Sequence, residues 1–214
     1  MEVNRLRLDM THFLNHNFNS LPIFNAYTIL KMPFGTCQDY GFAAMVFMRS
    51  KGIPVAMDYT PQWPNRMHGH SWNVVLTNRH ENVMFSAFST NPNSPHYPNN
   101  PFGKVLRYTF QPNEKVIEIL NKDKFLPTSL NNIFMQDVSD EYMRTDNITV
   151  KPNIKEKVTG TPYIAVFNNF EWKPIYWGIK KSSKITYERL GRNVIYLPVH
   201  HKNERMFPIG LPLF

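Results

Sequence analysis

The sequence holds a single cysteine, Cys37, and it stands where a helix is expected to begin. Residues 37–50 are predicted to be helical, with Thr36 as the N-cap and Asp39 in the first turn. The free N–H groups and the positive dipole end at that position favour a thiolate, so we expect the pKa of this thiol to be lowered. The same amides, those of Cys37 and Gln38, can donate to an oxyanion that forms on an attacked carbonyl group.

A nucleophilic thiol also needs a general base, and His70 is the candidate. It stands at the head of a strand-like run, residues 71–76, and a second run, residues 83–88, reads as the antiparallel hairpin partner. Pairing these runs across the polar turn between them places His70 opposite Thr90, with an uncertainty of a residue or two in the register.

A third group must hold the imidazole in orientation. No acidic residue occurs between Asn82 and Glu114, so the nearby candidates are Ser89, Thr90 and Asn91. Asn91 is the preferred one, because its amide oxygen can accept a hydrogen bond from the ring. Asp58, on the strand expected before that of His70, is an alternative orienting residue. The alternative to this role is a structural one, in which Asp58 caps an element or braces a loop.

Several segments, in this order, resemble the transglutaminase-like superfamily of cysteine enzymes. They are Gly-Thr-Cys-Gln-Asp at 35–39, Arg-Ser-Lys-Gly-Ile-Pro-Val at 49–55 and His-Gly-His-Ser-Trp at 68–72. The resemblance implies a papain-like arrangement in which Cys37 on a helix faces His70 on a sheet. It also implies cysteine-dependent acyl transfer or hydrolysis on peptide, protein or carboxamide substrates. The acidic residue that the family places on the following strand is missing here.

The resemblance extends over about residues 20–110, and segments of the second half look like those of larger secreted bacterial members. It therefore implies an extracellular or periplasmic protein that is shortened at its N-terminus, since residues 1–20 show no export signal. No stretch approaches the roughly 20 apolar residues that a membrane-spanning helix needs.

The fold class expected from these patterns is α+β. Residues 1–120 are predicted to form the papain- or transglutaminase-like core, and residues 121–136 a linker. Residues 137–214 contain short β-like runs between turn signals, which predict a small antiparallel, β-sandwich-like domain.

Two tryptophans, Trp63 and Trp72, are candidate substrate-binding residues that could line a cleft, and packing against the core is the alternative for both. The histidines of His68-x-His70 would lie on one side of a strand and could bind zinc, but the match to the family assigns His70 as the base. We expect neither a metal nor a cofactor. The second functional hypothesis is a non-catalytic module that keeps the fold and binds a glycan or a peptide.

Positive charge is concentrated in the last part of the chain. Residues 151–214 carry 11 Lys and Arg against 4 Asp and Glu, a net charge of +7, whereas residues 1–150 carry 13 against 12, a net charge of +1. Because the basic residues are scattered among strand-like apolar ones, we interpret them as a solvated face and expect no nucleic-acid partner.

Overall fold

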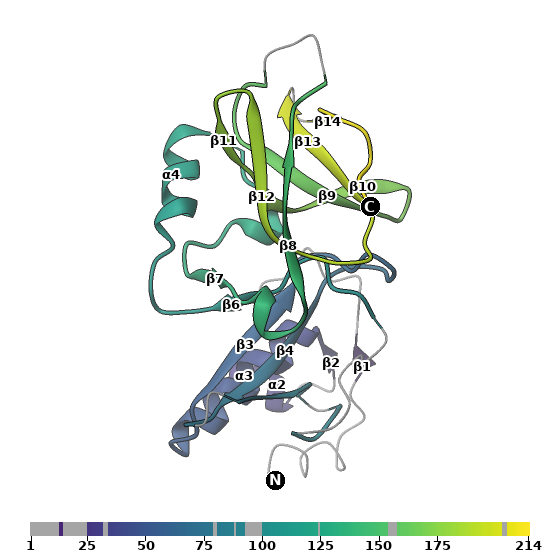
Figure 1. Ribbon diagram of the computed structural model, residues 1–214. Coiled ribbons are helices and arrows are strands. Elements are labelled where there is room, and N and C mark those ends of the chain that lie inside the picture. Colours follow the sequence, from purple (N-terminus) through teal and green to yellow (C-terminus); the bar gives the residue numbers. More distant parts are fainter. Residues whose placement is uncertain are drawn as a thin grey trace. The chain divides into compact units, whose positions relative to one another are not determined.

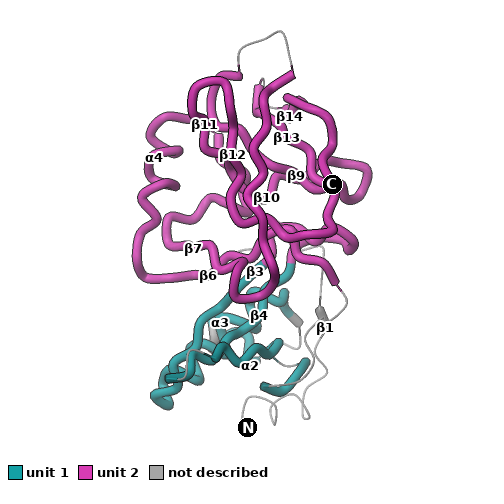
Figure 2. Tube along the Cα trace, viewed as in Figure 1, with its two compact units in different colours: residues 1–59, 70–99 teal, residues 60–69, 100–214 magenta. Residues whose placement is uncertain are grey.

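The computed structural model describes residues 13–14, 25–31, 34–78, 81–87, 89–92, 100–123, 125–153, 158–202 and 205–214. The chain forms two compact units (Figure 2). Unit 1 comprises residues 1–59 and 70–99, and unit 2 comprises residues 60–69 and 100–214. Within the described residues the fold is α+β, with mostly antiparallel sheets and few helices, as expected from the sequence.

Unit 1 contains two helices and a small sheet in its described residues (Figure 1). Its strands β3 to β5 follow the order β5-β4-β3, and two further short strands, β1 and β2, pair in parallel. The elements are β1 (Phe13–Leu14), α2 (Ala26–Lys31), β2 (Phe34–Gly35), α3 (Cys37–Ser50), β3 (Val55–Thr60), β4 (His70–Leu76) and β5 (Asn82–Phe85).

Helix α3 begins and ends where the sequence predicts. Thr36 is the N-cap, and its hydroxyl accepts from the Asp39 amide while the Asp39 carboxylate accepts from the Thr36 amide, which completes a capping box. Gly52, at φ 74°, follows the C-cap in the left-handed conformation that glycine adopts without strain. Apolar side chains of α3, among them Tyr40 and Met48, pack with Val55 and Phe85 of the sheet.

Unit 2 is rich in antiparallel sheet, as predicted for the C-terminal part of the chain (Figure 1). One sheet has the order β10-β9-β13-β14, another has the order β11-β12-β8, and β6 pairs with β7. The elements are β6 (Leu106–Tyr108), α4 (Glu114–Lys122), η1 (Thr128–Leu130), β7 (Met135–Asp137), η2 (Ser139–Glu141), β8 (Thr145–Val150), β9 (Pro162–Asn168), β10 (Glu171–Trp177), β11 (Ile179–Lys181), β12 (Lys184–Gly191), β13 (Tyr196–Lys202) and β14 (Arg205–Pro208).

The units divide the chain differently from the expected domains. Residues 100–120, which were expected in the core, belong to unit 2 together with the short segment 60–69. The expected linker, residues 121–136, contains the end of α4, the turn η1 and the start of β7. Among the described residues, no helix combines the length and the apolar character that crossing a membrane requires.

Candidate active site around Cys37

The sheet of unit 1 presents one face to helix α3. Asn73 of β4 is fully buried, and its Nδ2 donates to the carbonyl oxygen of Gly41 in α3 at 3.0 Å. A Cβ added to Gly41 would lie 2.5 Å from the Sδ of Met57 in β3, so glycine permits this close approach. Because side chains alternate along a strand, Ser71 lies on the same face as Asn73. The start of α3, with Cys37, is thereby fixed relative to β4.

The sulfur of Cys37 lies among hydrogen-bond donors. These are the backbone N–H groups of Ser71, Gln38 and Cys37 itself, together with the Ser71 hydroxyl, and each of them favours the thiolate. Burial acts in the opposite direction and is the largest effect, so the pKa of Cys37 is raised above its ordinary value of 9.0. The expectation of a lowered pKa was therefore wrong, because the cost of desolvating the thiolate exceeds the help from the helix terminus.

Ser71 can donate to the sulfur because the ladder between β4 and β5 stops before reaching it. The last pair in that ladder is Asn73 with Phe85. The N–H of Ser71 points to the same side of β4 as that of Asn73, since backbone groups of alternate residues share a direction. The Cys37 sulfur accepts from an N–H group that β5 leaves unpaired. Ser71 was not among the residues singled out from the sequence, and only its position next to His70 could have indicated it.

His70 is the first residue of β4 and precedes Ser71 in the chain, but its ring lies on the face of the sheet opposite to the Ser71 side chain. It stacks on Trp72, two residues along the strand, with ring centroids 5.9 Å apart and planes at 25°. Strand alternation puts both rings on the face opposite to Ser71 and Asn73. Cys37 therefore meets the residue that follows His70, while the imidazole lies against Trp72.

The predicted register of the hairpin was wrong by two residues. Leu76 pairs with Asn82 and Val75 with Val83, whereas the prediction paired Thr77 with Val83. Strand β5 ends at Phe85, and the chain turns at Ser86, whose carbonyl accepts from the amides of residues 89 and 90. Ser89, Thr90 and Asn91 thus follow that turn instead of continuing the ladder, and Asn91 is exposed. The ladder gives Asn91 no place opposite His70.

Asp58 has the position that Asn91 lacks. Strand β3 lies beside β4, and the amide of Leu76 donates to the carbonyl of Pro54 at 2.9 Å. If the two strands continue antiparallel from this bond, four residues back along β4 and four forward along β3 bring Trp72 opposite Asp58. The Asp58 side chain then lies on the face that carries His70. Diagonal neighbours on a sheet are about 7–8 Å apart at Cα, within reach of long side chains. Asp58 has an exposed fraction of 0%, so its carboxylate lies within the protein near the imidazole face.

The two candidate substrate-binding tryptophans are both buried. Trp72 has an exposed fraction of 0% in unit 1, and Trp63 has one of 3% in unit 2. Trp63 stacks on Phe102 with centroids 4.7 Å apart. Burial of this kind is what the packing alternative predicts, so we assign neither residue to substrate binding.

The histidines of His68-x-His70, which were considered as an alternative zinc pair, do not have the strand geometry that this alternative requires. His68 lies outside β4 with φ of 62°, a left-handed conformation, so it does not share a strand side with His70. Within the described part of the chain, no three His, Cys, Asp or Glu residues are grouped so that they could hold a metal ion.

The raised pKa of Cys37 predicts slow alkylation in the free protein. The rate of iodoacetamide modification should be low at pH 7 and should rise through a midpoint above pH 9, because only the thiolate attacks. Mass spectrometry of the Cys37 peptide measures this rate, with N-acetylcysteine in the same tube as the reference thiol. A midpoint below pH 8 would restore the original expectation of a preformed thiolate.

Comparisons with known proteins yield no match: no family model, no curated protein and no solved structure is similar to this chain. The assignment of chemistry therefore depends on the geometry around Cys37.

Proposed function

We propose that the protein is a cysteine-dependent enzyme for acyl transfer or hydrolysis on peptide or carboxamide substrates, and that unit 1 is a transglutaminase-like core. Cys37 is the nucleophile and His70 the general base. The observation that carries the proposal is the contact of the Cys37 sulfur with the N–H and hydroxyl of Ser71. The thiol opens a helix beside the strand that carries His70, but the imidazole lies on the other face of that strand, so the nucleophile–base pair forms only when the ring turns toward the sulfur.

The raised pKa of Cys37 defines how such an enzyme would work. The thiol starts neutral, so His70 removes its proton as the sulfur attacks the substrate carbonyl carbon. The carbonyl oxygen becomes an oxyanion, to which the amides of Cys37 and Gln38 donate. As the tetrahedral intermediate collapses, the C–N bond breaks and the amine leaves with the proton from His70. Water or a second amine then attacks the thioester and regenerates the thiol.

His70 has to reach the sulfur when substrate is bound, whereas in the free protein its ring lies against Trp72. Catalytic hydrogen bonds often tighten only in the substrate complex. We assign to Asp58, in place of Asn91, the role of orienting the His70 ring. Its buried carboxylate lies on the same face of the sheet as the imidazole. A carboxylate also stabilises the imidazolium that forms in this step.

An acylation assay tests the proposal. Incubation with p-nitrophenyl acetate at pH 7.5 should release nitrophenolate and add one acetyl group at Cys37, the only thiol of the chain. The Cys37→Ala variant should lack this adduct. Adding methylamine distinguishes acceptors, since a transferase yields N-methylacetamide and a hydrolase yields acetate. Absence of an adduct under conditions that acylate N-acetylcysteine would refute the proposal.

A second candidate function is a non-catalytic module that retains this core and binds a peptide or a glycan. The burial that raises the pKa of Cys37 favours it, because a binding module has no need for a reactive thiolate. Under this alternative, Cys37→Ala leaves ligand binding unchanged and the acylation assay gives no adduct.

A further inference from the structure

Unit 2 contains a cavity of about 440 Å³ that the chemistry of Cys37 does not involve. Its size is that of a small-molecule site. Strands β7, β10 and β12 contribute to its wall, so separate segments of one unit converge on it. The lining residues on which the argument depends are Gln136, Asp137, Tyr176, Trp177, Glu188 and Arg189.

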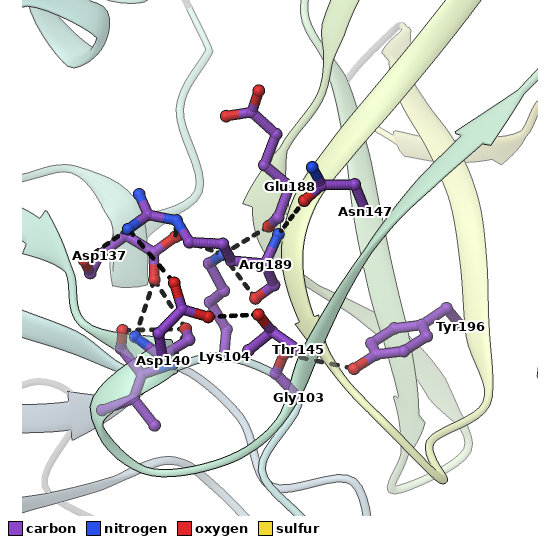
Figure 3. A network of polar contacts seen from close by, with 11 residues as sticks. Gly103, Lys104, Asp137, Asp140, Thr145, Asn147, Glu188, Arg189 and Tyr196 are labelled. Atoms are coloured by element: carbon purple, nitrogen blue, oxygen red, sulfur yellow. Dashed lines mark hydrogen bonds and ion pairs between the residues drawn. The ribbon is translucent and has the colours of Figure 1, made fainter.

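A network of polar contacts (Figure 3) includes three residues of the cavity lining, Asp137, Glu188 and Arg189. Lys104, with an exposed fraction of 0%, places its Nζ 2.5 Å from Asp137 Oδ2, and it donates to the carbonyls of Glu188 and Arg189 at 2.7 and 3.0 Å. Arg189 Nε lies 3.1 Å from the same carboxylate oxygen of Asp137. The network therefore neutralises Asp137 and fixes the backbone of residues 188–189.

A bulge in β12 produces this arrangement. Pairing between β12 and β8 shifts register between Tyr187 and Leu190, and Arg189 adopts a left-handed φ of 50° while its amide donates to Asn147 Oδ1 at 2.9 Å. The bulged carbonyls turn to Lys104. Bulges commonly redirect side chains at functional sites, and here the bulge holds Glu188 and Arg189 at the cavity.

The aromatic part of the wall carries two hydrogen-bond donors. Tyr176 and Trp177 stack with centroids 4.1 Å apart, and their exposed fractions are 7% and 4%. The Tyr176 hydroxyl and the Trp177 ring N–H are hydrogen-bond donors of residues that line the cavity. Burial next to Asp137 raises the pKa of Tyr176, so the hydroxyl keeps its proton and can donate. Donors in a cavity wall gain from a ligand that accepts their hydrogen bonds.

The charges of the lining select the chemical class of that ligand. Lys115 and Arg189 balance Asp137 and Glu188, so the wall has no net charge. The wall offers no net charge to attract an ionic ligand. An apolar ligand would leave the amide, hydroxyl and carboxylate groups of the wall without hydrogen-bond partners. A neutral molecule with many hydroxyl groups offers both donors and acceptors to such a wall.

We infer that this cavity of unit 2 is a binding site for a neutral saccharide, whose hydroxyl groups would bond to the Tyr176 hydroxyl, the Trp177 ring N–H and the side chains of Gln136, Glu188 and Arg189. The site is separate from the chemistry assigned to Cys37, so either assignment can fail without the other.

Titration with cellobiose, maltose and N,N′-diacetylchitobiose tests this inference. Binding is measured by calorimetry and by the NMR chemical shift of the Trp177 indole N–H. At least one disaccharide should bind saturably and shift that resonance. Tyr176→Phe removes only the hydroxyl and should weaken binding about three- to tenfold. The matched control is Tyr187→Phe, which removes the unpartnered hydroxyl of a fully buried tyrosine outside the cavity lining and should leave the affinity unchanged.

Three results would overturn the saccharide site. One is the absence of saturable binding of all three disaccharides at millimolar concentration. Another is equal affinity of the wild type and Tyr176→Phe, with Tyr187→Phe as the reference for folding effects. The last is binding of a neutral peptide, with acetyl-trialanine amide as the probe, in the absence of saccharide binding.

Discussion

Replacing Lys104 with methionine is expected to lower the free energy of unfolding by about 3–5 kcal/mol, as measured by urea denaturation at pH 7. The substitution keeps the apolar stem and removes the ammonium group from a site where its exposed fraction is 0%. Asp137, whose side chain is 2% exposed, then loses its closest partner, and the carbonyls of Glu188 and Arg189 lose their donor. The loss is large because the buried carboxylate then keeps only the partly exposed Arg189 as a cationic partner.

The matched control for Lys104 is Lys122→Met. Lys122 also forms an ion pair, with Glu118 on helix α4, but its side chain is 70% exposed. Solvent screens such a pair, so this variant should unfold close to the wild type. The double variant Lys104→Met/Asp137→Leu should be less destabilised than the two single losses added together, because both partners are removed at once. If Lys104→Met and Lys122→Met have the same free energy of unfolding, the network around Lys104 does not stabilise the fold.

The same network predicts how stability depends on pH. Burial lowers the pKa of Lys104 to about 8 from 10.5, and the Asp137 carboxylate opposes this effect only in part. Between those two values the unfolded chain binds more protons than the folded one, so this group makes stability rise with pH. Below pH 8 lysine is charged in both states and contributes no slope. The difference between wild type and Lys104→Met should therefore grow from pH 8 to pH 10.

Local signals in the sequence predicted the elements that hold the site. The N-cap Thr36 and the stop at Gly52 are short-range features, and α3 extends over the predicted residues 37–50. The short β-like runs predicted between residues 137 and 214 are also found as strands of unit 2; β9, for example, is Pro162–Asn168. Alternation and turn residues carry that information within a few positions.

The register of the hairpin could not be read from the same signals. A side-chain hydrogen bond from Thr77 Oγ1 to the Glu81 carbonyl, at 2.6 Å, spans the turn, and Leu76 pairs with Asn82 immediately before and after it. The pattern of apolar residues is unchanged by a shift of two, because the same side chains stay on the same face. The choice of Asn91 as the orienting residue depended on the predicted register. In the observed register Asn91 lies beyond the end of the ladder and is exposed.

Burial explains the difference at Cys37. The helix terminus predicts a lowered pKa for this thiol, but burial of the sulfur disfavours the thiolate and raises the pKa. The sequence around Lys104 does not indicate its buried contacts, since its partners Glu188 and Arg189 are 84 and 85 positions away in the chain. Contacts at that separation leave no trace in a local pattern.

Cys37 needs His70 as its base in order to act as an enzyme nucleophile. His70→Gln keeps a planar, hydrogen-bonding side chain beside Trp72 but cannot accept a proton at neutral pH. Because the pKa of the thiol is raised, the reaction lacks a preformed thiolate and depends on proton removal during attack. General-base catalysis contributes about 100- to 10,000-fold, and the loss should be of that size.

The most direct measurement is the rate constant for acetylation of Cys37 by p-nitrophenyl acetate at pH 7.5 in wild type, His70→Gln and His68→Gln. His68 is the matched control, since it lies two residues away and outside β4. A loss of about 100-fold or more in His70→Gln alone, with thermal midpoints unchanged, is the expected result. Equal rate constants in all three proteins would contradict the pairing of Cys37 with His70 and leave the non-catalytic module as the function of this core.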